Sequence, residues 1–309
     1  MPIRIPDGLP AKADLLKEKI YTIDELRAST QDIRPLKILL LNLMPKKEET
    51  ELQILRLLGN SPLQVDIDFC RLASHDSKTT PRSHLTKFYM TFDEIQAEFY
   101  DGCIITGAPV EHLDFSEVDY YGELEEFFDW TKSHVFSTIH LCWGAQAGLY
   151  HHYDIAKLPL DEKLFGVYPV NIDFKGHPII RGFDDYYYVP VSRHSCSDAA
   201  AIYAEPGLDV LTCSFDFGPE IVARPDNRQI FIMGHLEYDR ETLGNEYRRD
   251  LSEGKWIQQP YNYFPSGNTG LEPAFVWRSH ANLLYYNWLN FVYQETPYII
   301  EAIADLKLN

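Results

Sequence analysis

Long apolar runs alternate with segments of helical periodicity over the first half of the chain. Residues 35–44 (PLKILLLNLM) form a continuous apolar run without a period of two, which is typical of a strand buried on both faces. Residues 47–59 then carry leucines at helical spacing and end in Gly59. The repeated strand–helix pattern predicts an α/β fold with a mostly parallel central sheet and helices on both faces, which is a three-layer arrangement.

The same pattern predicts the other elements of this half. They are strands over 63–70, 101–109 and 135–141, and helices over 92–100 and 116–133, the second of them capped by Ser116. Beyond residue 160 the runs become shorter and are joined by turns. The strands expected there cover 163–174, 185–191, 208–215 and 219–236, with PDNR as a hairpin turn, and two helices follow at about 239–252 and 275–293.

No linker-like segment, internal repeat or low-complexity tract divides the chain after its first residues. Residues 1–34 are expected to form an extended, proline-containing N-terminal arm with one short helix near 23–29. Residues 35–309 are expected to form a single α/β domain, which is long enough to bury a large core.

Charge and composition exclude several classes of partner. The net charge of −18 has no basic run to offset it, which argues against a nucleic-acid partner. No stretch approaches the roughly 20 apolar residues of a membrane span, and the first residues lack the apolar core of a secretory signal. Five cysteines without a CxxC pair indicate a reduced, cytoplasmic protein. His151 and His152 are adjacent rather than four apart, so no metal site is expected.

Cys142 stands where the run 135–141 ends and the chain turns into a helical pattern. In open parallel sheets, functional groups collect beyond the carboxyl ends of the strands. Gly144 and Ala145 are small where a sharp strand-to-helix turn, such as the nucleophile elbow of hydrolases, needs close backbone approach. Spacing alone leaves two interpretations open: Cys142 is a nucleophile on such a turn, or it is a buried structural thiol.

A second apolar run ends in His235-Leu236-Glu237. In an extended chain, residues i and i+2 point to the same side, so His235 and Glu237 are expected to share one. A carboxylate beside an imidazole orients the ring and stabilises its charged form. A lone histidine at a strand end is more often structural, but together with Cys142 this pattern predicts a Cys–His–Glu triad.

These motifs resemble those of the class I glutamine-amidotransferase fold, where a Cys elbow (here LCWGAQA), a His-x-Glu strand end (here HLE) and a glycine turn (here TGAP, 106–109) form one site. The closer resemblance is to the homoserine O-acyltransferases of methionine biosynthesis, the MetA type. It runs from MPIRIPDGLPA through DIRPLKILLLNLMPKK, IITGAPVE, HLCWGAQAGLYHHY, VSRHS and MGHLEYD to LEPAFVWRSHANLLYYNWLNFVYQETPY, which is essentially the whole chain.

The resemblance implies transfer of an acyl group from an acyl-CoA co-substrate to the hydroxyl of L-homoserine by a ping-pong route, with no further cofactor and in a homodimer. Cys142 matches the family's acyl-thioester nucleophile, His235 matches its general base, and Glu237 completes the triad. The positions that match substrate contacts in the family are Lys163, Ser192 and Arg249. An Arg249 guanidinium suits the homoserine carboxylate, which it can bind with two parallel hydrogen bonds.

The tetrahedral intermediates of acyl transfer need hydrogen-bond donors. The candidates are the backbone N–H of Trp143 and one from the Gly107–Ala108 turn. A helix beginning after Cys142 would favour the thiolate. The side chains of Trp143 and Tyr150 are candidate walls against water, although core packing is the more usual role for Tyr150.

Glu111 and Ser192 match the positions that govern the acyl donor in the resembling family. At position 111, Glu accompanies acetyl-CoA use and Gly accompanies succinyl-CoA use. A succinyl carboxylate about 4 Å from Glu111 would be repelled by on the order of 4 kcal/mol at an effective dielectric near 20. The predicted product is therefore O-acetyl-L-homoserine, with succinyl transfer as the alternative.

Two other classes of function stay open at this point. One is a glutamine amidotransferase-type cysteine hydrolase on the same fold. His140 stands where that pattern has glycine, and Gly107–Ala108 stands where it often has two glycines, so both argue against glutamine hydrolysis. The other class is a non-catalytic binding protein, against which the intact Cys142, His235 and Glu237 argue.

Overall fold

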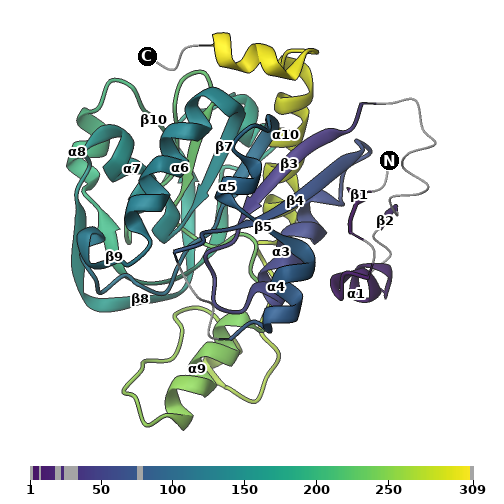
Figure 1. Ribbon diagram of the computed structural model, residues 1–309. Coiled ribbons are helices and arrows are strands. Elements are labelled where there is room, and N and C mark those ends of the chain that lie inside the picture. The colour runs from purple at the N-terminus through teal and green to yellow at the C-terminus, as the bar shows by residue number, and fades with distance from the viewer. Residues whose placement is uncertain (1–2, 7, 18–21, 24–33, 75–78, 307–309) are drawn as a thin grey trace.

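The computed structural model describes residues 3–6, 8–17, 22–23, 34–74 and 79–306. In these residues the strands form one sheet of 12 strands, in the order β2-β1-β4-β3-β6-β7-β12-β11-β10-β8-β9, with β5 beside β4 (Figure 1). The strands are β1 Ile3–Arg4, β2 Thr22–Ile23, β3 Leu36–Leu41, β4 Val65–Arg71, β5 Tyr89–Thr91, β6 Tyr100–Ile105, β7 Val135–Leu141, β8 Lys157–Ile172, β9 Tyr186–Ser197, β10 Asp209–Ser214, β11 Gly218–Ala223 and β12 Gln229–Ile232. The α-helices are α1 Ala11–Lys17, α3 Lys47–Leu58, α4 Arg82–Phe88, α5 Phe92–Ile95, α6 Tyr121–His134, α7 Trp143–Tyr153, α8 Ala199–Ala204, α9 Thr242–Ser252 and α10 Arg278–Glu295, and four short 3₁₀ turns cover Phe115–Glu117, Pro178–Ile180, Pro265–Gly267 and Ile300–Asp305.

The sheet changes character at β12. From β1 to β12 the neighbouring strands are parallel, whereas β12, β11, β10, β8 and β9 pair antiparallel. This is the mostly parallel α/β sheet that the strand–helix alternation predicts. The change of direction follows the switch, beyond residue 160, from strand–helix units to strands joined by turns, because parallel neighbours need a crossover and antiparallel ones only a turn.

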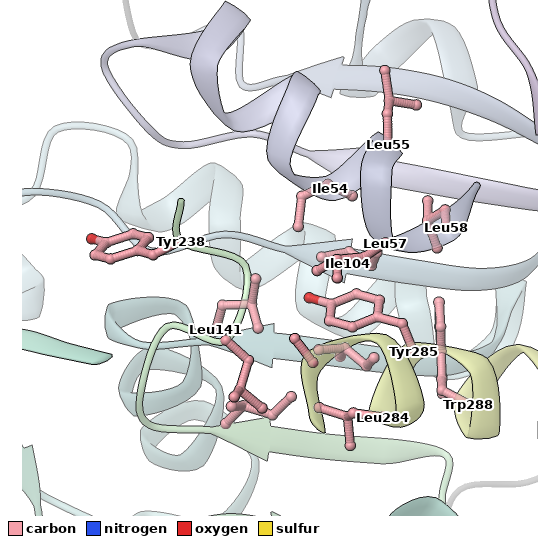
Figure 2. Close-up of a cluster of buried hydrophobic side chains, with 14 of the residues drawn as sticks. Ile54, Leu55, Leu57, Leu58, Ile104, Leu141, Tyr238, Leu284, Tyr285 and Trp288 are labelled. Atoms are coloured by element: carbon pink, nitrogen blue, oxygen red, sulfur yellow. The ribbon is translucent and has the colours of Figure 1, made fainter. Parts of the chain in front are cut away.

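Alternate residues of β3 reach the cores on opposite faces of the sheet. Ile38 and Leu40 belong to the cluster of Figure 2, and Leu39 and Leu41 belong to a second cluster. A strand with helices over both faces therefore needs apolar residues at consecutive positions, which explains the run Ile38–Leu41.

Helices cover both faces, as predicted. In the first cluster, α3 contributes Ile54 and Leu55, and α10 contributes Leu284 and Trp288 (Figure 2). In the second, α6 contributes its buried face, including Phe128. The predicted helices over 239–252 and 275–293 are present as α9 and α10, and the PDNR turn joins β11 to β12 as expected.

Two expectations about helices are wrong. The helix expected over 92–100 ends at Ile95, because Tyr100 is fully buried as the first residue of β6. Ser116 is not a cap: Asp114 forms a capping box with Glu117 at a 3₁₀ turn, and α6 begins only at Tyr121.

The described part of residues 1–34 packs against the sheet. Ile3–Arg4 adds a parallel strand beside Val65–Asp66, and Leu15 of α1 is fully buried. The sequence pattern did not indicate α1, and the short helix expected near 23–29 falls almost wholly on 24–33, outside the described residues. The division of the chain at residue 34 stays a prediction.

Candidate active site

The carboxyl ends of four parallel strands meet at one edge of the sheet. The register pairs Leu41 with Ile105, Ile105 with His140, and Leu141 with Ile232, so the segments that follow β3, β6, β7 and β12 begin side by side. These segments border a cavity of about 800 Å³. Its wall includes Cys142 and His235, and the position is the one at which open α/β sheets bind ligands.

Cys142 occupies a strained turn between β7 and α7. Its φ is 49° and its ψ is −114°, a combination that L-residues rarely adopt and that costs of order 1–3 kcal/mol. Its N–H donates to the Ile232 carbonyl at 2.7 Å, and its carbonyl accepts from Ala145 and Gln146. The predicted strand-to-helix elbow is therefore present, with the thiol at the cavity wall.

Small residues allow the elbow to form. A Cβ at Gly144 would lie 2.6 Å from the Thr106 carbonyl oxygen, so only glycine fits there. A Cβ at Gly107 would lie 3.3 Å from the Cys142 Cβ and 3.6 Å from the Trp143 nitrogen. The turn after β6 therefore approaches the elbow closely, and it brings Gly107 and Ala108 to the cavity wall beside Cys142.

His235 and Glu237 are in contact, as predicted, but in a turn rather than an extended segment. β12 ends at Ile232, and the Tyr238 N–H donates to the His235 carbonyl at 3.2 Å. His235 Nδ1 lies 2.7 Å from Glu237 Oε1, and both side chains are buried. The His235 ring also stacks on Tyr238, with centroids 4.0 Å apart and planes 9° apart. Glu237 and Tyr238 thus fix the imidazole.

The charges around His235 favour its protonated form. Burial lowers the pKa of His235, but the neighbouring Cys142 and Glu237 side chains outweigh it and hold the pKa well above its usual value. An imidazolium stabilised by Cys142 is the counterpart of a thiolate, and the thiolate is the reactive form of cysteine. The surroundings of His235 therefore favour an imidazolium that a carboxylate supports.

Trp143 is an oxyanion-hole candidate through its backbone N–H and not through its side chain. The N–H of Trp143 belongs to the first turn of α7, where backbone donors have no partner within the helix. The Trp143 indole instead packs in the second cluster, 5.7 Å from the Phe115 ring. Tyr150 stacks on Phe115 as well. Neither side chain is at the cavity wall, so the wall role expected for Trp143 is wrong, and Tyr150 packs on Phe115 rather than on the cavity. The aromatic residues at the wall are Phe165, Tyr238 and Trp256.

Lys163, Ser192 and Arg249 all lie at the cavity wall and converge on Glu246, a residue that the sequence analysis missed. Lys163 Nζ lies 2.5 Å from Glu246 Oε1, and Ser192 Oγ donates to the same oxygen at 2.8 Å. Arg249 Nη2 lies 3.9 Å from it and pairs more closely with Asp250 Oδ1, at 2.7 Å. The i, i+3 spacing of Glu246 and Arg249 on a helix was the signal that could have found this acid.

Glu111 also lies at the cavity wall. Burial raises the pKa of its carboxyl group, while nearby His112 and His235 act in the opposite direction. Lys157 Nζ donates to the Glu111 carbonyl oxygen at 2.9 Å and to the Leu113 carbonyl oxygen. The loop that carries Glu111 is thus held in place from β8.

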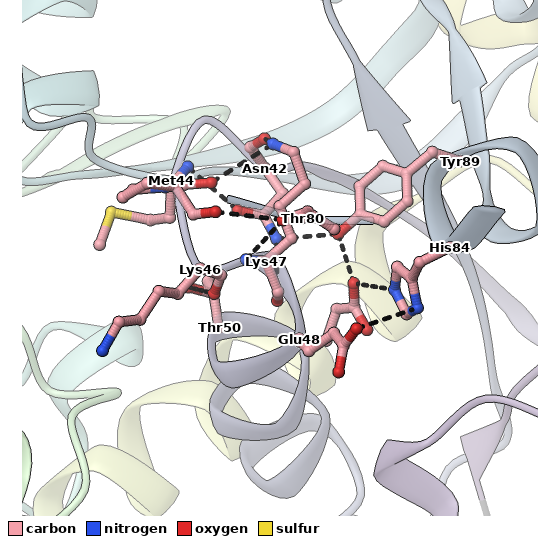
Figure 3. A network of polar contacts seen from close by, with 11 residues as sticks. Asn42, Met44, Lys46, Lys47, Glu48, Thr50, Thr80, His84 and Tyr89 are labelled. Atoms are coloured by element: carbon pink, nitrogen blue, oxygen red, sulfur yellow. Dashed lines mark hydrogen bonds and ion pairs between the residues drawn. The ribbon is translucent and has the colours of Figure 1, made fainter. Parts of the chain in front are cut away.

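A buried polar network supports the opposite wall, which Met44, Pro45 and Lys46 form. Figure 3 shows Lys47 donating to the Asn42 carbonyl, and Asn42 Nδ2 donating to the Tyr89 hydroxyl at 2.9 Å. Tyr89 donates to Glu51 at 2.7 Å, and His84 Nε2 lies 2.8 Å from the same oxygen. Burial lowers the pKa of Lys47 to about 8. The network fixes the start of α3 at the edge of the cavity.

Two other kinds of feature are absent from the described part of the chain. No group of three or more His, Cys, Asp and Glu side chains in this part of the chain could hold a metal ion. None of the helices in the described ranges is long and apolar enough to cross a membrane.

Known proteins resemble this chain in fold and in sequence. A glutamine amidotransferase structure from Thermotoga maritima is similar with a TM-score of 0.58 and 10% identity, over 84% of this chain and 99% of that one, which bears on the fold alone. A homoserine O-acetyltransferase of Shouchella clausii is 53% identical over 97% of this chain and 98% of its own. Another, of Geobacillus kaustophilus, is 54% identical over 96% of this chain and 99% of its own. The family model for homoserine O-succinyltransferase matches residues 2–298, and the chain belongs to this family.

Proposed function

We propose that the protein transfers an acetyl group from acetyl-CoA to the hydroxyl of L-homoserine through a thioester on Cys142, and so makes O-acetyl-L-homoserine for methionine biosynthesis. The observation that carries the proposal is the meeting of Cys142, on its strained turn, and the Glu237-supported His235 at one cavity wall with the substrate-binding candidates. Relatives with about half of their residues identical are named homoserine O-acetyltransferase. The chemistry needs acetyl-CoA as co-substrate and no resident cofactor.

In the first half-reaction, the Cys142 thiolate attacks the thioester carbonyl carbon of acetyl-CoA. The negative charge that develops on the carbonyl oxygen is stabilised by N–H donors, for which Trp143 and the Gly107–Ala108 turn are the candidates. The carbon–sulfur bond to CoA then breaks, and the His235 imidazolium gives its proton to the departing CoA sulfur. A thiolate displaces a thiolate, so the step is nearly balanced in energy.

In the second half-reaction, neutral His235 takes the proton of the homoserine hydroxyl as its oxygen attacks the acetyl-Cys142 carbonyl carbon. The bond to Cys142 breaks, O-acetyl-L-homoserine leaves, and the thiolate–imidazolium pair is restored. Glu237 stabilises the imidazolium in both half-reactions through its 2.7 Å contact with Nδ1. Its role is orientation and charge stabilisation rather than proton transfer.

Homoserine presents one carboxylate and one ammonium group, and the cavity wall offers partners for both. The Arg249 guanidinium suits the carboxylate, because its planar N–H groups match two oxygens. The Glu246 carboxylate, in contact with Lys163 and Ser192, suits the ammonium group. These contacts would hold the hydroxyl end toward Cys142.

Succinyl-CoA is the second candidate donor, because the matching family model carries the succinyltransferase description. Glu111 favours acetyl-CoA, since its carboxylate lies at the wall of the cavity that holds Cys142 and would repel a succinyl carboxylate. The experiment that tests both is free-thiol release from acetyl-CoA and from succinyl-CoA, each with and without L-homoserine. Without homoserine, release should stop after about one equivalent per enzyme, because only Cys142 is acetylated; continued release from acetyl-CoA that does not depend on homoserine would contradict the proposed function.

The homodimer and the cytoplasmic location expected from the sequence stay predictions. Gel filtration with light scattering would test the first, and cell fractionation would test the second.

A further inference from the structure

The cavity is larger than homoserine and an acetyl group require. A volume of about 800 Å³ is in the range that encloses a drug-sized ligand, whereas homoserine and an acetyl group are far smaller. Four consecutive residues after α9, from Lys255 to Gln258, also line it. In Figure 1 this part of the chain projects beside α9, away from the sheet.

Trp256 is exposed in a way that the other tryptophans are not. Its side chain is 81% exposed, while Trp130, Trp143, Trp277 and Trp288 are each 9% exposed or less. Exposing a large aromatic ring to water is unfavourable in free energy, so an exposed ring often marks a binding surface. The Trp256 ring borders the cavity that contains Cys142.

The backbone on either side of Trp256 is fixed. The helix α9 ends in a Schellman motif, in which the Lys255 N–H donates to the Asp250 carbonyl at 3.0 Å and the Gly254 N–H donates to Leu251 at 3.0 Å. At the other end of the loop, Tyr261 exchanges two backbone hydrogen bonds with Phe165 and Val167 of β8, at 2.9 and 2.8 Å. The exposed ring is therefore carried on a loop held at both ends.

We propose that this loop, residues 254–261, is the binding site for the nucleotide end of the acyl-CoA, with Trp256 as the stacking platform for the adenine ring and Lys255 as a partner for its phosphates. The inference rests on the proposed function, which places the thioester at Cys142. The pantetheine arm then extends along the cavity, and the nucleotide emerges where the wall is solvent-exposed.

The chemistry of the loop suits this ligand. Every purine has a π-face, so an aromatic side chain binds it by stacking. Lys255 Nζ contacts Glu253 at 2.7 Å, but the side chains are 61% and 47% exposed, so the ammonium can turn toward a phosphate. In a chain with a net charge of −18, a local cation matters for holding a polyanion.

The test compares a complete donor with a truncated one. Trp256→Ala is expected to raise the KM for acetyl-CoA roughly tenfold, the usual loss of one base stack, and to leave unchanged the rate with the acetyl thioester of N-acetylcysteamine, which has no nucleotide. Trp256→Phe should recover most of the loss, and Lys255→Gln should show a smaller effect on the same donor. Tyr298→Ala, which removes a ring that is 84% exposed elsewhere, is the matched control. Equal losses with both donors would overturn the proposal.

A binding measurement separates this inference from the proposed function. Because the other tryptophans are buried, quenching of tryptophan fluorescence by CoA or by adenosine 3′,5′-bisphosphate, but not by pantetheine, is expected in the wild type and should vanish in Trp256→Ala. Absence of quenching in the wild type would overturn the nucleotide site even if acetyl transfer is found. Quenching without homoserine-dependent thiol release would contradict the proposed function and leave the nucleotide site standing.

Discussion

The Glu237 carboxylate lies 2.7 Å from His235 Nδ1, which leaves Nε2 as the ring nitrogen available to exchange a proton. Glu237 contributes to the raised pKa of His235, so Glu237→Gln should lower that pKa. The imidazolium that protonates the departing CoA would then be lost at lower pH, and the alkaline limb of the kcat/KM profile for acetyl-CoA should move to lower pH. An unchanged limb would separate Glu237 from the charge state of His235.

His235→Asn should slow both half-reactions by roughly 10²–10⁴-fold, the usual contribution of a general base. Acylation measured by rapid-quench mass spectrometry and deacylation by homoserine should both be affected. Circular dichroism equal to that of the wild type would show that the fold is intact. Near-wild-type turnover in this variant would reject the triad.

Cys142→Ala should abolish both transfer and the covalent intermediate, since Cys142 is the one cysteine among the described residues that line the cavity, and a thioester needs a thiol. Intact-mass spectrometry after mixing with acetyl-CoA should show one added acetyl group on the wild type and none on the variant. Cys103→Ala is the control, because that thiol is fully buried in a strand away from the cavity wall. An acetyl adduct on Cys142→Ala would remove this residue from the mechanism.

The parts of the site that the sequence predicted are those carried by local pattern. The elbow at Cys142 and the pairing of His235 with Glu237 follow from where apolar runs end, because parallel strands bring their carboxyl ends to one edge. Glu246 was missed because its role depends on α9 lying over the cavity. Irregular segments flank α9, so its sequence alone does not predict how the helix packs on the rest of the protein. Trp256 was missed for the same reason: exposure is a property of the folded surface.

The fold was predicted well where burial is two-sided and poorly where short elements depend on their surroundings. The run 35–44 identified β3, whose alternate residues enter two cores. The prediction of a helix over 92–100 was wrong because Tyr100 belongs to β6 and pairs with Val135 of β7. These two residues are 35 positions apart in the sequence, so no local pattern indicates the pairing.

Gly144→Ala should destabilise the protein by about 1–3 kcal/mol, the usual cost of overpacking, because the added Cβ would lie 2.6 Å from a backbone oxygen. Gly122→Ala is the matched control: nothing lies within 4 Å of its Cβ position in α6, so alanine should stabilise the helix by about 0.5–1 kcal/mol. Urea unfolding of both variants gives the comparison. Equal free energies of unfolding would show that the elbow has room for a side chain.

Arg249→Lys should raise the KM for homoserine more than the KM for acetyl-CoA, because an ammonium group cannot make two parallel hydrogen bonds to a carboxylate. Arg248→Lys, one position along the same helix and absent from the cavity wall, is the control. Initial rates with each substrate varied in turn measure both constants. The reverse pattern would place Arg249 on the CoA side of the cavity.

Donor selectivity should depend on pH through Glu111. Burial raises the pKa of this carboxyl group, so it loses its charge at a higher pH than an ordinary glutamate as the solution is acidified. Above that pKa the ionised carboxylate repels a succinyl group, and below it the repulsion is lost. The ratio of kcat/KM for succinyl-CoA to that for acetyl-CoA should therefore rise as pH falls toward about 5.5, where a succinyl carboxylate with an ordinary pKa is still mostly ionised.

Glu111→Gly should raise this ratio at neutral pH, by up to about a thousandfold if the two charges meet at 4 Å, and should make it independent of pH. Taking the ratio within one enzyme cancels the titration of His235, which both donors share. A ratio that is flat with pH in the wild type, or that Glu111→Gly leaves unchanged, would remove Glu111 from donor selection while leaving the chemistry of Cys142 intact.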